Sequence, residues 1–220
     1  RQMLSHLPVG GGNAYHVLRW GALPPGMQLP AGVVSVRMAG VPAGGAGVQR
    51  SRFETRNRAV REYVARADCR VLFNPNPLQP GVEPLSRPGR AALVATLYDL
   101  TPLVLGPAMF PVDTEACMER YRARIGHLRL HADHLVAISH ASARDAVALL
   151  GLPEKKVSVV RCGVGGVFRE APREAVTACL EAFGLGEAAG RYVLSVGGFN
   201  PKKNLPRVLE AVGRLPAALQ

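Results

Sequence analysis

The stretch LVAISHASARDAVALLGLPEKKVSVVRC, residues 135–162, decides the fold class of this chain. LVAIS is a short apolar run typical of a buried strand, and Ser139 at its end can cap the helix predicted over ASARDAVALL. Gly151 and Pro153 end that helix, and VSVVRC follows as a second strand. This alternation of strand, helix and strand is typical of a parallel sheet.

The same alternation continues toward the N-terminus. Apolar alternation predicts strands, and apolar residues at helical spacing, such as Val60 and Val64, predict helices. We therefore expect an α/β fold in which a Rossmann-like parallel sheet carries helices on both faces. The expected elements are a helix after the glycine run of LPVGGGNAYHVLRW, a strand at 32–38, a helix at 56–67, strands at 71–73 and 92–98, and a helix from Thr114 to about Leu130 with Asp113 as its N-cap.

The C-terminal part predicts the beginning of a second unit. FREAPREAVTACLEAFGLGEAAG indicates a polar helix and a glycine-rich break, after which YVLSV, residues 192–196, indicates a strand and LPRVLEAVGRL a helix. One strand and one helix cannot bury a core alone. We therefore expect a Rossmann-like domain over 1–170, a linker over 171–190, and the first strand and helix of an incomplete second Rossmann-like domain over 191–220.

The composition narrows the class of partner and the compartment. The net charge is +11, but only four of the 27 basic residues are lysines, and the arginines are spread along the chain. Because no basic stripe is interleaved with aromatic residues, we expect no specific nucleic-acid binding. Neither an apolar run of membrane length nor a signal peptide is evident, so we expect a cytoplasmic protein, with peripheral contact to the inner face of the membrane left open.

Cysteines and histidines give no clear metal signal. The four cysteines lie far apart, which favours reduced thiols. His127, His131 and His134 have the i, i+4, i+7 spacing of one helix face, which could hold a metal, but Asp133 would point elsewhere on such a helix. Solvated or capping histidines are the favoured interpretation, and we expect no metal site.

Polar residues that directly follow strands mark the candidate site, because parallel sheets bind ligands beyond the carboxyl ends of their strands. Near the C-terminus, two lysines stand where a helix begins, and a cation there is unfavourable unless an anion lies opposite. Solvated lysines, and an Asp99 that only caps a loop, remain the structural alternatives. The candidates are Asn74, Asp99, Ser139, Gly163, the loop at Gly197, and Lys202 with Lys203.

Four segments together resemble one enzyme family. They are VAISHASARDAVALLGLPEKKVSVVRCGVGGVF, YVLSVGGFNPKKNLPRVLEA, LYDLTPLVLGPAMFP and VGGGNAYHVLRW, which span most of the chain. In order and spacing they are similar to the motifs of retaining glycosyltransferases with the GT-B architecture, of the type called family 4.

The resemblance implies two Rossmann-like domains that face a cleft, an N-terminal acceptor domain and a C-terminal domain for the nucleotide-sugar. The implied reaction transfers a hexose from a nucleoside diphosphate sugar to a saccharide, lipid-linked or protein acceptor, with retention of configuration. It implies no cofactor beyond that donor substrate and no metal. The 220-residue chain by itself is expected to be inactive.

The resemblance also assigns roles to residues. Lys203 matches the lysine of the family's (R/K)KN motif, and Lys202 occupies its first position, so both are expected at the donor diphosphate. Gly197 and Gly198 would let the backbone approach that diphosphate. The glycine loop Gly10, Gly11 and Gly12 is expected near the donor phosphates and the acceptor, with a flexible turn as the alternative.

The catalytic residues stay unassigned, with Asp99 and Tyr98 as candidates at the cleft. Tyr98 stands where relatives often have histidine, and a tyrosine cannot carry a proton at neutral pH as an imidazole does. Cys162 and Gly165 replace the family's Asn and Asp, and its E-x₇-E carboxylates would fall after Gln220.

Tyr98, Cys162 and Gly165 depart from the family's motifs, and these departures support a different class of function, a non-catalytic GT-B-like interaction domain. A dinucleotide-dependent oxidoreductase is a weaker hypothesis. No strand here leads into G-x-G-x-x-G with an acidic residue about 20 positions on.

Overall fold

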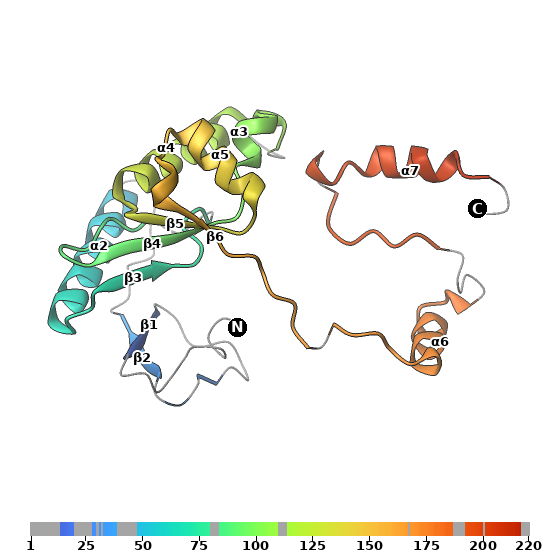
Figure 1. Ribbon diagram of the computed structural model, residues 1–220, viewed down its shortest axis with the longest axis horizontal. Helices are drawn as coiled ribbons and strands as arrows, with labels where there is room; N and C mark the ends of the chain where they lie inside the picture. The colour runs from blue at the N-terminus through green and yellow to red at the C-terminus, as the bar shows by residue number, and fades with distance from the viewer. Residues whose placement is uncertain are drawn as a thin grey trace. The chain divides into compact units, whose positions relative to one another are not determined.

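The computed structural model describes residues 14–19, 28–29, 31, 33–38, 48–79, 84–109, 114–166, 168–186, 192–199 and 201–216. By their contacts, the residues fall into two units, one of 1–100 with 120–162 and one of 101–119 with 163–220. Figure 1 labels the helices and strands of both units along the chain.

A four-stranded parallel sheet forms the centre of the first unit. Its strands are β3 (Val71–Asn74), β4 (Ala92–Leu97), β5 (His134–Ala137) and β6 (Val157–Val159), and they lie side by side in chain order. All three neighbouring pairs are parallel. The expected α/β fold with a parallel sheet is therefore confirmed, and each of these four strands lies where the sequence predicts one.

The connection from β5 to β6 follows the predicted pattern in detail. Helix α5 spans His140–Leu150, and the hydroxyl of Ser139 accepts a hydrogen bond from the backbone N–H of Ser142, at 3.1 Å. Gly151 ends the helix with φ 61°, a left-handed conformation that favours glycine. A 3₁₀ turn, η2 (Glu154–Lys156), then leads into β6.

One face of the sheet holds the main core of this unit. Leu93, Leu97 and Leu135 are fully buried on it, and helices α4 (Thr114–His131) and α5 lie over the sheet (Figure 1). Right-handed crossovers between strands that follow in chain order place their helices on the same face. On the opposite face, Val71 of β3 is 58% exposed.

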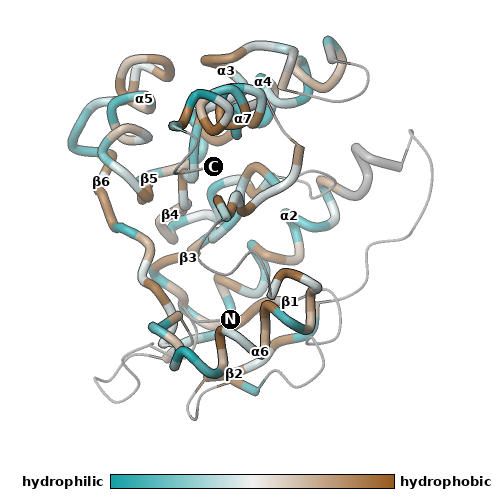
Figure 2. The backbone as a smooth tube through the Cα atoms, turned by 90° about the vertical axis from the view of Figure 1, so that its right-hand side faces the viewer, coloured by the Kyte–Doolittle hydropathy of each residue, from teal (hydrophilic) through white to brown (hydrophobic). Residues whose placement is uncertain are grey.

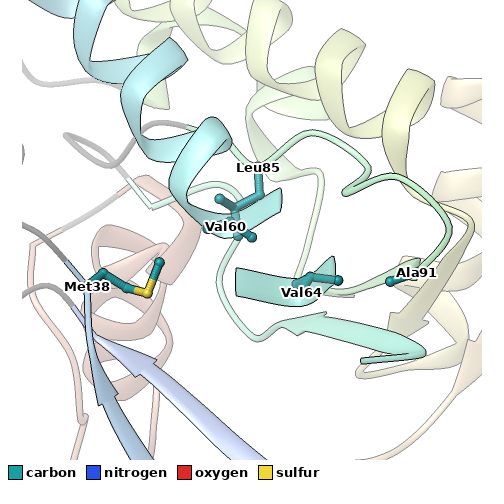
Figure 3. Close-up of a cluster of buried hydrophobic side chains, with 5 residues drawn as sticks. All are labelled: Met38, Val60, Val64, Leu85 and Ala91. Carbon is teal, nitrogen blue, oxygen red and sulfur yellow. The ribbon is translucent and has the colours of Figure 1, made fainter. Parts of the chain in front are cut away.

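A second apolar cluster joins helix α2 (Val48–Arg66) to the strands around it. Figure 3 shows its buried members, with Val60 and Val64 on α2. Leu18 and Val36 pack against the cluster from a two-stranded parallel sheet, β1 (Tyr15–Arg19) with β2 (Val33–Arg37). The other buried members are Met38, Leu85 and Ala91.

The expected helix after the glycine run is wrong, because residues 15–19 form strand β1. This segment, YHVLR, pairs in parallel with β2, from Tyr15 opposite Val33 to Arg19 opposite Arg37. Tyrosine and valine suit a pleated, half-buried surface. Pairing along the whole of β2 outweighs the weak helical spacing of so short a segment.

The second unit contains short helices and extended chain. Helices α6 (Arg173–Ala182) and α7 (Leu205–Gly213) confirm the two helices predicted here. Helix α7 carries both apolar and polar residues, as its brown and teal stretches in Figure 2 show. The unit also holds α3 (Thr101–Leu105) and two 3₁₀ turns, η1 (Pro107–Met109) and η4 (Pro201–Lys203).

The strand expected at residues 192–196 is not formed. The segment is exposed, and no strand pairs with it in the part of the chain that the structure describes. A strand needs a hydrogen-bonded neighbour, and apolar sequence alone does not supply one. The domain boundaries near residues 170 and 190 stay a prediction. Among the described helices, none is long and apolar enough to cross a membrane.

The position of Leu135 yields a test of the core. Leu135 is 1% exposed, and its truncation leaves a cavity between β5 and the covering helices. We expect Leu135→Ala to lower the free energy of unfolding by about 2–5 kcal/mol, measured by urea denaturation. Leu130→Ala is the matched control, since Leu130 is 78% exposed on α4, and it should change the free energy by less than about 0.5 kcal/mol. Equal losses would contradict the assigned core.

Candidate functional site

The carboxyl ends of the parallel strands present three of the predicted site residues at one edge of the sheet. Asn74 ends β3, Asp99 follows β4 and Ser139 follows β5. The register pairs Leu97 with Ala137, so the residues after β4 and β5 leave the sheet at the same level. The fourth candidate, Gly163, is exposed and belongs to the second unit.

Asn74 makes a local turn. Its side-chain Oδ1 accepts a hydrogen bond from the backbone N–H of Asn76, at 3.2 Å. Asparagine commonly forms such a turn by bonding its own backbone two residues on. The contact ends β3 within the Asn-Pro-Asn-Pro sequence, which gives Asn74 a structural role beside the predicted one.

Side chains of two helices hold the segment Tyr98–Asp99 through hydrogen bonds to its main-chain carbonyl groups. The hydroxyl of Ser142 donates a hydrogen bond to the carbonyl oxygen of Tyr98, at 2.7 Å. The phenol of Tyr121, on α4, donates to the carbonyl oxygen of Asp99, at 3.5 Å. Leu100, the next residue, is fully buried. The turn after β4 is therefore anchored on both sides, while the side chain of Tyr98 is 45% exposed.

The position of Tyr121, buried and close to Asp99, also changes the pKa of its phenol. Burial raises the pKa of the Tyr121 phenol well above its ordinary value, and the negative charge of Asp99 raises it further. The phenol therefore keeps its proton through the neutral range and stays a hydrogen-bond donor.

Ser139 combines a capping role with a place at the sheet edge. Its hydroxyl accepts from the N–H of Ser142 and also lies 3.0 Å from the hydroxyl of Ser142. The capping role predicted from the sequence is confirmed by this contact.

The predicted phosphate-binding turn brings together two of its residues. The side chain of Lys203 passes so close to Gly197 that a Cβ built on the glycine would lie 3.0 Å from Lys203 Cε and 3.6 Å from its Nζ. Gly197 also has φ 134°, which side-chain-bearing residues rarely adopt. A Cβ on Gly198, by contrast, would meet nothing within 4 Å.

Both lysines belong to the 3₁₀ turn η4, one residue before α7, and both are exposed. Asn204 follows in a left-handed conformation, with φ 50°, and starts α7. Lys202 and Lys203 therefore precede the helix instead of forming its first turn. The glycine loop Gly10, Gly11 and Gly12 lies outside the described residues, as does the expected N-cap Asp113.

The three histidines do not share one helix face. His127 and His131 lie on α4 with ring centroids 4.2 Å apart, whereas His134 begins β5 and its Nε2 lies 2.7 Å from the Ser158 hydroxyl. The shared helix face considered for the three histidines is not formed, because α4 ends at His131, close to the predicted end near Leu130. Among the residues that the structure describes, no three His, Cys, Asp or Glu side chains form a group that could hold a metal.

Asp133 makes a structural contact between β4 and the start of β5. Its Oδ2 accepts a hydrogen bond from the N–H of Leu93, at 2.8 Å, and lies 3.2 Å from Arg87 Nε. Residue 133 lies outside α4, and this double contact fixes the entry into β5.

Sequence reasoning missed Ser142 and Tyr121 as residues that shape the site. Ser142 had a signal, because it stands three residues after the N-cap Ser139, at the position where a polar side chain commonly bonds back toward the cap. Tyr121 had none, since its partner Asp99 is distant in sequence.

No protein-family model matches the chain, and the comparison with curated proteins gives no match.

The environment of His127 predicts an acid sensitivity. Burial lowers the pKa of His127, the charge of His131 lowers it further, and a hydrogen bond to the Leu85 backbone acts in the opposite direction. Its ring lies edge-on to Phe53, and its Nε2 is 3.4 Å from the Ser86 hydroxyl. Because the unfolded chain binds this proton more readily, stability should fall as the pH drops below about 6.5.

We expect the urea midpoint of the parent protein to fall between pH 7.5 and pH 5.5, and His127→Gln to reduce that fall. His140→Gln, on the exposed start of α5, serves as the control and should keep it. An unchanged slope in His127→Gln would show that another group causes the acid sensitivity.

The turn at Gly197 gives a matched pair of glycine substitutions. Gly197→Ala must strain the backbone at φ 134° and displace the Lys203 side chain, whereas Gly198→Ala meets open space. We expect the side-chain NMR resonances of Lys203 to shift in Gly197→Ala and to stay in place in Gly198→Ala. Equal shifts in both variants would mean that Lys203 does not lie against Gly197 in solution.

Proposed function

We propose that this chain forms the acceptor-side domain of a retaining GT-B glycosyltransferase, with residues 191–220 belonging to its nucleotide-sugar-binding domain. The enzyme transfers a hexose from a nucleoside diphosphate sugar to an acceptor. Two features support the proposal: the motif segments that resemble family 4, of which the N-terminal one forms strand β1 in place of a helix, and a parallel sheet whose strand ends carry Asp99 and Ser139.

The observation that carries the proposal is the contact of Lys203 with Gly197. This contact places the Lys203 ammonium group close to two consecutive glycines, Gly197 and Gly198, which have no side chains. A diphosphate approaching the turn at these residues would meet the positive charge of Lys203 and, at Gly198, a main chain with open space beside it. The N-terminus of α7, a helix with its own partial positive charge, begins two residues later.

The chemistry of the reaction explains why such a turn is useful. When the bond between the sugar's anomeric carbon and the diphosphate oxygen breaks, negative charge develops on the departing diphosphate. A fixed ammonium lowers the barrier because it acts where charge develops. Lys203 is the residue that we assign to this role, and Lys202 adds charge beside it.

The edge of the first unit's sheet supplies groups suited to a saccharide. Asp99 can accept hydrogen bonds from sugar hydroxyls, and the phenol of Tyr98 can both donate and accept. Because the main chain of both residues is anchored, their side chains would meet a ligand with little further ordering. We assign binding and orientation to this pair, and no proton transfer to Tyr98.

A second candidate function is a GT-B-like interaction domain that performs no transfer. It is favoured by Tyr98, Cys162 and Gly165, which replace residues that the family uses at the cleft and the hinge. Cys162 is exposed and Gly165 is half-buried, so neither is required by a core. In the enzyme, the turn at Gly197 and Lys203 binds the diphosphate of the donor, whereas in the interaction domain it binds no donor.

Replacement of Lys203 tests the enzyme proposal. We expect Lys203→Ala to lower kcat for hexose transfer by about 10²-fold in the full-length polypeptide, because one donor to a developing oxyanion is worth that much. The measurement is a screen of nucleoside diphosphate sugars with detection of the released nucleotide. Lys155→Ala, an exposed lysine of η2, is the charge-matched control and should leave kcat unchanged.

The possible outcomes separate the two functions. Transfer by Lys203→Ala at the parent's rate would remove the phosphate role of this lysine. A folded parent that transfers no sugar from any donor would instead favour the interaction domain.

A further inference from the structure

Ser142 is a polar side chain buried in the first turn of α5. It is 5% exposed, and a buried hydroxyl without partners is costly, by about 1–3 kcal/mol. Two oxygen atoms satisfy it: the Tyr98 carbonyl oxygen at 2.7 Å and the Ser139 hydroxyl at 3.0 Å. The first belongs to the end of β4, and the second to the end of β5.

The direction of these bonds follows from the number of protons. A serine hydroxyl has one proton, and a carbonyl oxygen can only accept. Ser142 therefore donates its proton to Tyr98, and the proton between the two hydroxyls comes from Ser139. Ser139 in turn accepts from the Ser142 N–H. The three bonds form one directed chain from the α5 backbone to the strand end of β4.

Tyr121 holds the same turn from the other side. Its phenol, which keeps its proton, donates to the Asp99 carbonyl oxygen. Both carbonyl groups of the Tyr98–Asp99 pair are thus bonded to side chains of different helices. The rotation of these two peptide units is restricted, and with it the direction in which the side chains of Tyr98 and Asp99 leave the backbone.

We propose that Ser142 is a positioning residue, whose hydroxyl fixes the main chain of Tyr98 and so orients Tyr98 and Asp99 toward the ligand at the end of β4. Its effect on transfer rests on the function proposed above, whereas its effect on the backbone does not. The contact between Ser142 and Tyr98 joins two strand ends that are 44 residues apart in sequence. The helix cap formed by Ser139 is a separate role, and this separation makes a control possible.

The test compares Ser142→Ala with Ser139→Ala. Ser142→Ala removes the donor to Tyr98, and because alanine suits a helix, any loss of global stability comes from the missing hydrogen bonds of this hydroxyl. Ser139→Ala removes the helix cap, at a cost of about 0.5–2 kcal/mol, yet leaves Ser142 able to donate to Tyr98. Ser142→Thr keeps the hydroxyl and serves as the conservative rescue.

The first readout is the carbonyl ¹³C resonance of Tyr98. We expect it to shift in Ser142→Ala and to keep the parent's position in Ser139→Ala and Ser142→Thr. An unmoved resonance in Ser142→Ala, or an equal shift in Ser139→Ala, would overturn the proposal. This readout needs no enzymatic activity, so a failure of the proposed function does not obscure it.

The second readout is transfer by the full-length polypeptide. A positioning role predicts a loss of about tenfold in kcat for Ser142→Ala with the donor KM unchanged, and recovery in Ser142→Thr. A kcat loss in Ser142→Ala that Ser142→Thr does not recover would overturn the positioning role, and Ser139→Ala is compared only in the carbonyl resonance, because Ser139 is itself a candidate site residue. Undetectable transfer in the parent would reject the proposed function, and the carbonyl resonance alone would then decide whether Ser142 fixes the strand end.

Discussion

The parallel pairing of β4 with β5 is the constraint on which the candidate site depends. It sets Leu97 opposite Ala137, both fully buried, so the chain leaves both strands at one level. Only with this register can the first turn of α5 reach the carbonyl of Tyr98. A slip by one residue would turn the apolar side chains of one strand to the other face and would separate Ser142 from its partner. Core packing and site geometry therefore rest on the same contacts.

The sequence predicted the elements whose signals are local. The strands β3 to β6 are apolar runs with turn residues at their ends, and α5 is bounded by a capping serine and a left-handed glycine. The two wrong predictions concern segments whose conformation depends on whether a neighbouring strand pairs with them. Residues 15–19 are a strand because β2 lies alongside, and residues 192–196 are no strand because no neighbour pairs with them in the described part of the chain. Neither partner can be deduced from the segment itself.

The candidate site was predictable to a similar degree. A general rule about parallel sheets identified Asp99 and Ser139, and the cap at Ser139 is a pattern within four residues. The contacts of Ser142 with Tyr98 and of Tyr121 with Asp99 join residues 44 and 22 positions apart. They depend on how helices α4 and α5 pack on the sheet. Sequence therefore indicated which strand ends carry the site, whereas packing determines which side chains orient it.

The arrangement of Gly197 and Lys203 bears on the diphosphate role that we propose for this lysine. Gly197 adopts φ 134°, and the long side chain of Lys203 lies against it while remaining exposed. Holding an exposed lysine in one arrangement costs side-chain entropy, up to about 2 kcal/mol, and water solvates a free ammonium well. An anion at the turn would offset this cost, because an ammonium that is already held in place binds a diphosphate with less further ordering than a mobile one.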